Sequence, residues 1–108
     1  MKPKVIIESP YKGNVEQNLT YLRRCLRDAS IVRGENPMAS HMFFTQFLDD
    51  NIPEERALGI ECGLQWAERV QVAAFYVDYG WSDGMLKAKE RHERENRRIE
   101  IRHIGNNP

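Results

Sequence analysis

Glu61 is the residue of this 108-residue chain whose surroundings most strongly suggest chemistry. It lies in a helix predicted over residues 53–69, at the margin of the apolar stripe of that helix. A carboxylate partly drawn toward a sheet can serve as a nucleophile or a base. The alternative is a rim carboxylate paired with Gln65, Arg56 or another surface group. The stripe consists of Ala57, Ile60, Leu64 and Ala67.

Two glycines flank Glu61, at Gly59 and Gly63. Each glycine costs about 1 kcal/mol in a helix interior, so the pair suggests close approach of a strand or a ligand. Cys62 lies between them, but no base is placed to activate it, so we interpret it as a small buried hydrophobe. Cys62 and Cys25 form no disulfide framework, and both fall in predicted helices, which favours a reducing, cytoplasmic setting.

Polar side chains follow three of the predicted strands. Tyr11 comes after the first strand, where it can stack on a base or donate to a carboxylate, or simply cover the sheet end. His41 ends a second predicted strand, and a lone histidine is more often structural. Asp78 ends the third, where it can hold a ribose hydroxyl or serve as a turn residue. Ser82 begins a helix whose free N–H groups suit a phosphate or carboxylate, or it is an ordinary cap.

Charge and composition exclude several classes of partner. The chain has 16 Lys and Arg against 16 Asp and Glu, so it lacks the basic excess of a nucleic-acid binder. Along the last helix, Glu90–Arg94 and Glu93–Arg97 are spaced for ion pairs on a solvated face. No apolar run reaches the roughly 18 residues of a membrane span. The acids at 49–50 lack a third ligand, so we expect no metal and no cofactor.

The elements that must position these groups alternate between strands and helices. This alternation favours a single α/β domain over residues 1–108, with a small, mainly parallel sheet of about four strands and helices on both faces. In such sheets ligands bind at the carboxyl ends of the strands, where the polar loops converge. We predict strands at 5–7, 38–42, 72–77 and 99–102, helices at 15–32, 53–69 and 83–96, and a helical turn at 43–48.

Four strings of the sequence resemble nucleoside 2-deoxyribosyltransferase-like proteins, the small bacterial and phage relatives above all. Residues 5–11 resemble the first strand and loop of that superfamily, and residues 54–67 resemble its glutamate helix. A Ser-His after Pro-x-Ala at 37–41 and a Ser-x-Gly-Met at 82–85 match two shorter motifs. Together these strings cover most of the chain in order.

The resemblance implies a flavodoxin-like three-layer sandwich, a homo-oligomer and a nucleoside or nucleotide ligand. Glu61 matches the nucleophile, which attacks the anomeric carbon and forms a glycosyl-enzyme while a second group protonates the leaving base. Tyr11 matches the tyrosine that orients it. Asp50 and Asp78 lie only approximately where the family has an aspartate pair for sugar and base. The expected ligand-binding residues are Ser9, Pro10, His41, Asp50, Asp78, Ser82, Gly84 and Met85.

We therefore expect a domain that binds a nucleoside- or nucleotide-derived molecule at the carboxyl ends of its strands. Cleavage or transfer of an N-glycosidic bond through Glu61 is the activity that the resemblance implies. One alternative is a non-catalytic phage protein that sequesters a nucleotide immune signal in the bacterial cytoplasm. The other is a structural or oligomerisation module with a vestigial pocket.

Overall fold

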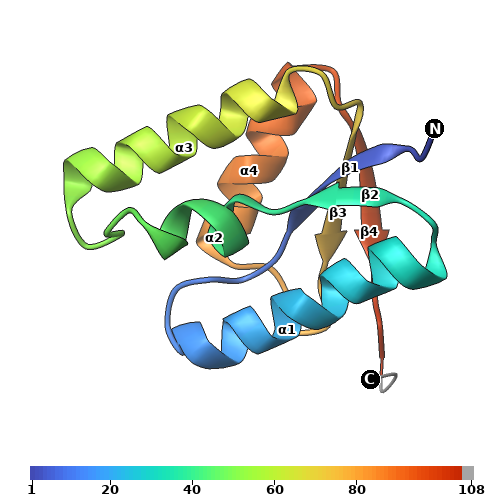
Figure 1. The fold of residues 1–108 in the computed structure, drawn as a ribbon, viewed down its shortest axis with the longest axis horizontal. Coiled ribbons are helices and arrows are strands. Elements are labelled where there is room, and N and C mark those ends of the chain that lie inside the picture. Colours follow the sequence, from blue (N-terminus) through green and yellow to red (C-terminus); the bar gives the residue numbers. More distant parts are fainter. Residues whose placement is uncertain (106–108) are drawn as a thin grey trace.

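A computed structural model of the chain describes residues 1–105. Its four strands form one all-parallel sheet in the order β2-β1-β3-β4, which confirms the predicted α/β class (Figure 1). In chain order the elements are β1 (Lys4–Glu8), α1 (Val15–Arg27), the π-helical turn η1 (Asp28–Val32), β2 (Asn36–Met38), α2 (Ser40–Phe43), the 3-10 turn η2 (Phe44–Gln46), α3 (Pro53–Ala67), β3 (Val72–Tyr76), α4 (Asp83–Arg94) and β4 (Arg98–Arg102).

Helices cover both faces of the sheet, as a three-layer sandwich requires (Figure 1). On one face α1 packs through Tyr21, Leu22 and Cys25. On the other face Ala67 of α3, together with Met85 of α4, packs against the sheet. The two hydrophobic cores stand back to back, because a central parallel strand is buried on both sides.

The first strand forms because its β-branched residues suit a pleated, buried surface. Val5, Ile6 and Ile7 are all buried, as predicted. After β1 the chain moves outward to β2, and after β2 it crosses to β3 on the other side of β1. The strand order therefore reverses between β1 and β3, and ligands bind in open α/β sheets outside such a reversal.

The second strand differs from the prediction. It spans Asn36–Met38 instead of 38–42, and Ser40 already begins the short helix α2. The backbone N–H of Asn36 donates to the Pro3 carbonyl at 2.8 Å, which fixes the pairing with β1. His41 therefore sits on a helix after the strand, still at the carboxyl edge of the sheet.

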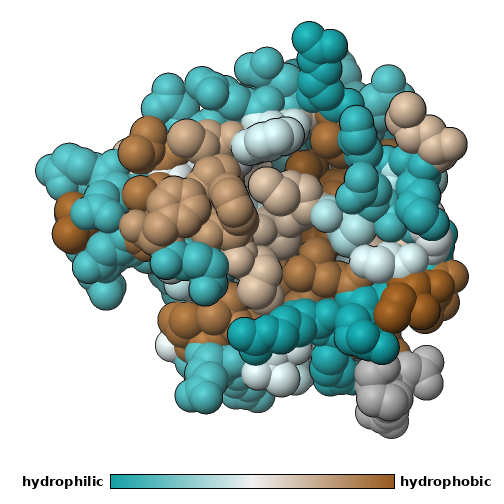
Figure 2. All heavy atoms as spheres, viewed as in Figure 1, coloured by the Kyte–Doolittle hydropathy of each residue, from teal (hydrophilic) through white to brown (hydrophobic). Residues whose placement is uncertain are grey.

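Apolar side chains gather on one face of the surface, around α2 and between α3 and α1 (Figure 2). Phe43 and Phe47, on this part of the chain, are 50% and 61% exposed. The expected self-association of the chain stays a prediction. Within residues 1–105, no helix is both long enough and apolar enough to cross a membrane.

Candidate functional site

A cleft of about 450 Å³ opens on the α3 and α4 side of the sheet. Its floor is the carboxyl end of β1, and its walls are α2, one face of α3 and the first turns of α4. The volume lies within the usual range of small-molecule sites, roughly 300–1,000 Å³. The cleft therefore lies where the strand order predicts a ligand.

The structure brings most of the predicted ligand-binding residues together at this cleft. They come from three separate segments of the chain, as expected for loops that follow parallel strands. Pro10 does not line the cleft, although its neighbours do. The predicted residues that line it are Ser9, Tyr11, His41, Asp50, Ser82, Gly84 and Met85.

The predicted position of Glu61 is wrong. Its side chain is exposed, and α3 lines the cleft with a different face, which includes Gly59, Ile60 and Gly63. The error has a physical cause: α3 carries apolar residues around its whole circumference, so its periodicity does not single out one buried side. Leu58, for example, is as apolar as the stripe but stays exposed.

Asp78 also lies away from the cleft, so its predicted position is wrong as well. On the α1 side it accepts hydrogen bonds from the Tyr21 hydroxyl and from the backbone N–H groups of Ile104 and Gly105. Burial opposes its ionisation, but these hydrogen bonds outweigh burial and hold the pKa of the Asp78 carboxyl below its usual value. Asp78 thus anchors the segment after β4.

Tyr11 lines the cleft, but its neighbour is His41 and not Glu61. The two rings lie 4.5 Å apart between centroids and are tilted by 33°. Burial lowers the pKa of His41, although the nearby carboxylates of Glu8 and Asp50 oppose this shift. The pair gives the cleft a flat, uncharged aromatic wall.

The N-terminus of α4 forms the opposite wall. Ser82 caps the helix, as predicted, by accepting the Met85 N–H at 3.1 Å. Gly84 has open space where a side chain would stand: a Cβ placed there would meet only the Ser82 hydroxyl, at 3.9 Å. The unpaired N–H groups of a first helical turn and the helix dipole favour an anion.

The two glycines of α3 mark a close approach, as predicted, but the neighbour is the segment around α2. A Cβ on Gly63 would come within 3.2 Å of the Ser40 Cβ. One on Gly59 would meet Leu48 and Phe44 at 3.5 and 3.6 Å. The glycines therefore set the distance between two walls of the cleft.

Sequence reasoning missed a chain of polar side chains that starts at the cleft lining and runs into the interior. We term it the open network: Glu8 and His92, which line the cleft, and Arg97. His92 is 2% exposed, and its Nε2 lies 2.7 Å from Glu8 Oε2. Its Nδ1 lies 2.7 Å from Nη1 of Arg97, itself 7% exposed. The spacing of His92 from Ala88 and Met85 is the helical signal that could have placed it on the buried face.

The end of α4 explains why the expected ion pair between Glu93 and Arg97 does not form. The helix ends at Arg94 because Asn96 adopts the left-handed conformation, with φ of 61°. The chain then turns back, so Arg97 bonds Glu95 and His92 instead of Glu93. Within the described residues, the ion pair along α4 is Lys89–Glu93, at 3.0 Å.

Two buried polar atoms at the cleft have no hydrogen-bond partner within the described part of the chain. They are Oγ of Ser9, a residue only 4% exposed, and Nε of Arg91. Both residues line the cleft. A buried polar group without a partner costs about 1–3 kcal/mol, so such atoms mark a place where a ligand or water supplies the missing bond.

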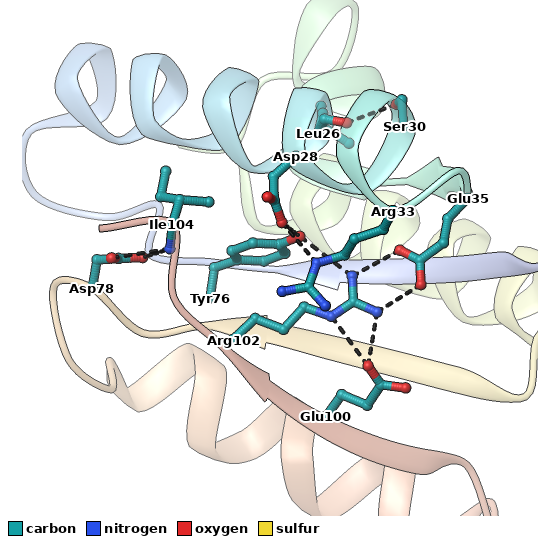
Figure 3. Close-up of polar contacts among 10 residues, drawn as sticks. All are labelled: Leu26, Asp28, Ser30, Arg33, Glu35, Tyr76, Asp78, Glu100, Arg102 and Ile104. Atoms are coloured by element: carbon teal, nitrogen blue, oxygen red, sulfur yellow. Dashed lines mark hydrogen bonds and ion pairs between the residues drawn. The ribbon is translucent and has the colours of Figure 1, made fainter. Parts of the chain in front are cut away.

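A second polar cluster lies on the α1 side and contrasts with the first (Figure 3). Arg102 donates two hydrogen bonds to the Glu35 carboxylate, at 2.8 and 2.7 Å. It also donates to Glu100 at 2.8 Å and to the Tyr76 hydroxyl at 3.3 Å. That hydroxyl in turn donates to Asp28 at 2.7 Å. We term this cluster the closed network: Asp28, Arg33, Glu35, Tyr76, Glu100 and Arg102.

Among residues 1–105, no three His, Cys, Asp or Glu side chains gather closely enough to hold a metal ion. The acidic side chains that line the cleft are Glu8, Asp50, Glu55 and Asp83. Asp50 lies 3.9 Å from Arg56, and Glu55 accepts the Asp49 N–H at 2.8 Å. The cleft thus offers separate carboxylates and cations instead of a metal cage.

Comparison with known proteins identifies the family without identifying an activity. No curated protein matches the chain. A family model described as a domain of unknown function (DUF7768) matches residues 3–103, which include every strand and helix. The chain therefore belongs to the DUF7768 family.

Proposed function

We propose that the chain binds a nucleoside- or nucleotide-derived small molecule in the cleft. One observation carries the proposal: the cleft lies at the reversal of strand order and contains two buried polar atoms, Ser9 Oγ and Arg91 Nε, that have no hydrogen-bond partner among residues 1–105. Sites for small molecules combine an apolar lining with a few such convergent polar groups.

The walls of the cleft suit the base and the phosphate of a nucleotide. The Tyr11–His41 pair offers a face on which a base can stack. The N-terminus of α4 suits a phosphate, and Arg91 adds a cation on the same helix. The resemblance of residues 5–11 and 82–85 to nucleoside 2-deoxyribosyltransferase-like proteins supports the same class of ligand.

Binding without turnover is the form of this function that the geometry supports best. Glu61, the residue that the resemblance assigns as nucleophile, is exposed and does not line the cleft. A protein that sequesters a nucleotide signal needs no nucleophile. Cleavage of an N-glycosidic bond through Glu61 is a competing proposal, which the binding and turnover assays below distinguish from binding alone.

The binding test is thermal denaturation of the chain with a panel of nucleosides and their 5′-monophosphates. We expect a concentration-dependent rise in melting temperature with at least one member, since a ligand that binds only the folded state stabilises it. Arg91→Met should weaken binding of both the monophosphate and the nucleoside, because it removes a buried donor and a cation from the cleft. Arg94→Met, on the exposed side of the same helix, is the matched control and should not. No response to any member would refute the proposal.

Turnover is followed in the same samples by chromatography of the free base. Intact ligand recovered after heating supports binding alone. Free base produced by the wild type and lost in a folded Glu61→Ala variant would establish the competing activity. Free base that persists in Glu61→Ala would assign cleavage to another group and end the role of Glu61.

A further inference from the structure

We infer that Glu8 is the carboxylate by which the cleft recognises adjacent hydroxyl groups of its ligand, and that His92 and Arg97 position it. The inference rests on the proposed function and narrows it to ligands that carry a vicinal diol, namely ribonucleosides and ribonucleotides. It is carried by the order of hydrogen bonds in the open network.

Arg97, at the buried end of the open network, determines which group donates in each of these hydrogen bonds. All three nitrogens of the Arg97 guanidinium have a partner: Nε donates to the Val70 carbonyl at 2.8 Å, Nη2 forms an ion pair with Glu95 at 2.7 Å, and Nη1 contacts His92. A guanidinium only donates hydrogen bonds. Nδ1 of His92 must therefore be the acceptor of this contact.

The ring hydrogen of His92 consequently lies on Nε2, which donates to Oε2 of Glu8 at 2.7 Å. A partner on the second nitrogen holds a histidine in one tautomer and one orientation, as it does for ligand-holding histidines elsewhere. The chain of donation runs from Arg97 through His92 to Glu8. Glu8 is its terminal acceptor.

Glu8 keeps most of its capacity to accept hydrogen bonds. It is the last residue of β1 and lines the cleft, with its side chain 19% exposed. Within residues 1–105, His92 is the one group that hydrogen-bonds this carboxylate, and it uses Oε2. An ionised carboxylate accepts through about four lone-pair sites, so Oε1 is available to a ligand.

The polar groups that line the same cleft as Glu8 define which hydrogen bonds that ligand must offer. The Glu8 carboxylate only accepts, the Ser9 hydroxyl both donates and accepts, and Arg91 Nε only donates. Two neighbouring hydroxyls satisfy this set, because each can donate to the carboxylate and accept from the hydroxyl or the guanidinium. In nucleosides the 2′- and 3′-hydroxyls of ribose are such a pair, and removal of one leaves an acceptor unmatched.

The test compares ribonucleotides with their 2′-deoxy and 3′-deoxy counterparts by titration calorimetry on the wild-type chain. We expect each deoxy ligand to bind roughly tenfold to a hundredfold more weakly, as befits loss of a hydrogen bond to a charged group. Equal affinity for ribo and deoxy ligands would overturn the inference while the proposed function stands. Absence of binding by all of them would refute the proposed function itself, and the inference with it.

Variants then assign the discrimination to the open network. In Glu8→Gln the ratio of ribo to deoxy affinity should fall toward one, while the affinity for the deoxy ligand changes little. Arg97→Met should lower the same ratio, which a purely structural role would not do. Glu68→Gln removes an equal charge from an exposed position outside the cleft and should leave the ratio unchanged. A ratio preserved in a folded Glu8→Gln variant would overturn the assignment.

Discussion

Two carboxylates at the same edge of the sheet have opposite surroundings. Asp78 follows β3 and is saturated by the Tyr21 hydroxyl and the N–H groups of Ile104 and Gly105. Glu8 ends the neighbouring strand β1 and, within residues 1–105, receives one hydrogen bond, from His92. The two side chains have the same functional group, so the number of protein partners determines how much capacity each carboxylate keeps to accept further hydrogen bonds.

The same contrast extends to the two faces of the sheet. On the α1 face the closed network pairs its charges with one another (Figure 3). On the α3 and α4 face the open network ends at Glu8, which lines the same cleft as Ser9 Oγ and Arg91 Nε, two atoms without a hydrogen-bond partner among residues 1–105. The charges are thus mutually paired on the α1 face, while polar groups on the other face keep capacity for further hydrogen bonds.

Breaking the closed network should have the largest effect on stability. Arg102 is 4% exposed, and Arg102→Met leaves Glu35 without the cation that it pairs with, while Glu100 keeps its pairing with the exposed Arg98. Removal of one partner from a buried ion pair costs about 3–5 kcal/mol of the free energy of unfolding. Urea denaturation measures the loss.

Arg98→Met is the control for that experiment. Arg98 also pairs with Glu100, but its side chain is 71% exposed, so we expect a loss below about 1 kcal/mol. Equal losses for the two variants would show that burial of the closed network is not what stabilises the α1 face.

Asp78→Asn should cause a smaller, pH-dependent loss, of about 1–3 kcal/mol at neutral pH. The pKa of the Asp78 carboxyl in the folded state lies below its ordinary value of 3.8. The stabilisation is therefore complete above 3.8 and is lost as the pH falls through the folded-state pKa. The difference in the free energy of unfolding between wild type and variant should be smaller in acid than at neutral pH. Urea denaturation at the two pH values measures it.

Glu8→Gln is the matched comparison, since it changes the other carboxylate of this edge. The amide oxygen of glutamine can still accept from His92, so we expect a change below about 1 kcal/mol. A loss as large as that of Asp78→Asn would contradict the division between the two faces. If the stability loss caused by Asp78→Asn does not change with pH, the hydrogen bonds to the ionised Asp78 carboxylate are not its source.

The two cysteines provide a test that leaves stability untouched. Burial raises the pKa of the Cys25 thiol, on the α1 face, to about 12, so little reactive thiolate forms there. Cys62, on α3, is only half-buried. Brief alkylation of the folded protein followed by mass spectrometry should label Cys62 alone. Labelling of Cys25 at the same rate as Cys62 would show that the core beneath α1 unfolds locally and often enough to expose the Cys25 thiol.

Local patterns sufficed for the long elements of the fold. The β-branched run at Val5 to Ile7 and the Ser82 cap of α4 specify their structures within a few residues, and both are confirmed. The strand β2 was misplaced because its three residues owe their extended pairing to β1, a contact distant in sequence. No local period marks so short an edge strand.

The candidate site was predictable in place but not in detail. The rule that ligands bind beyond the carboxyl ends of strands located the cleft, and Glu8 satisfies it as the last residue of β1. The contact of Arg97 with His92 could not be predicted from the sequence, because it depends on the left-handed conformation of Asn96. Glu61 was misjudged because α3 is apolar all round, so its orientation is decided by packing against α2.

Pro37 has a consequence for the outer margin of the sheet. The N–H of Asn36 is directed at β1, so the next residue along the strand presents its backbone nitrogen to the outside, and that residue is a proline with no hydrogen to give. An approaching strand from another molecule would find no donor at the middle of β2. Pro37 in this way disfavours extension of the sheet by a further strand at the β2 edge.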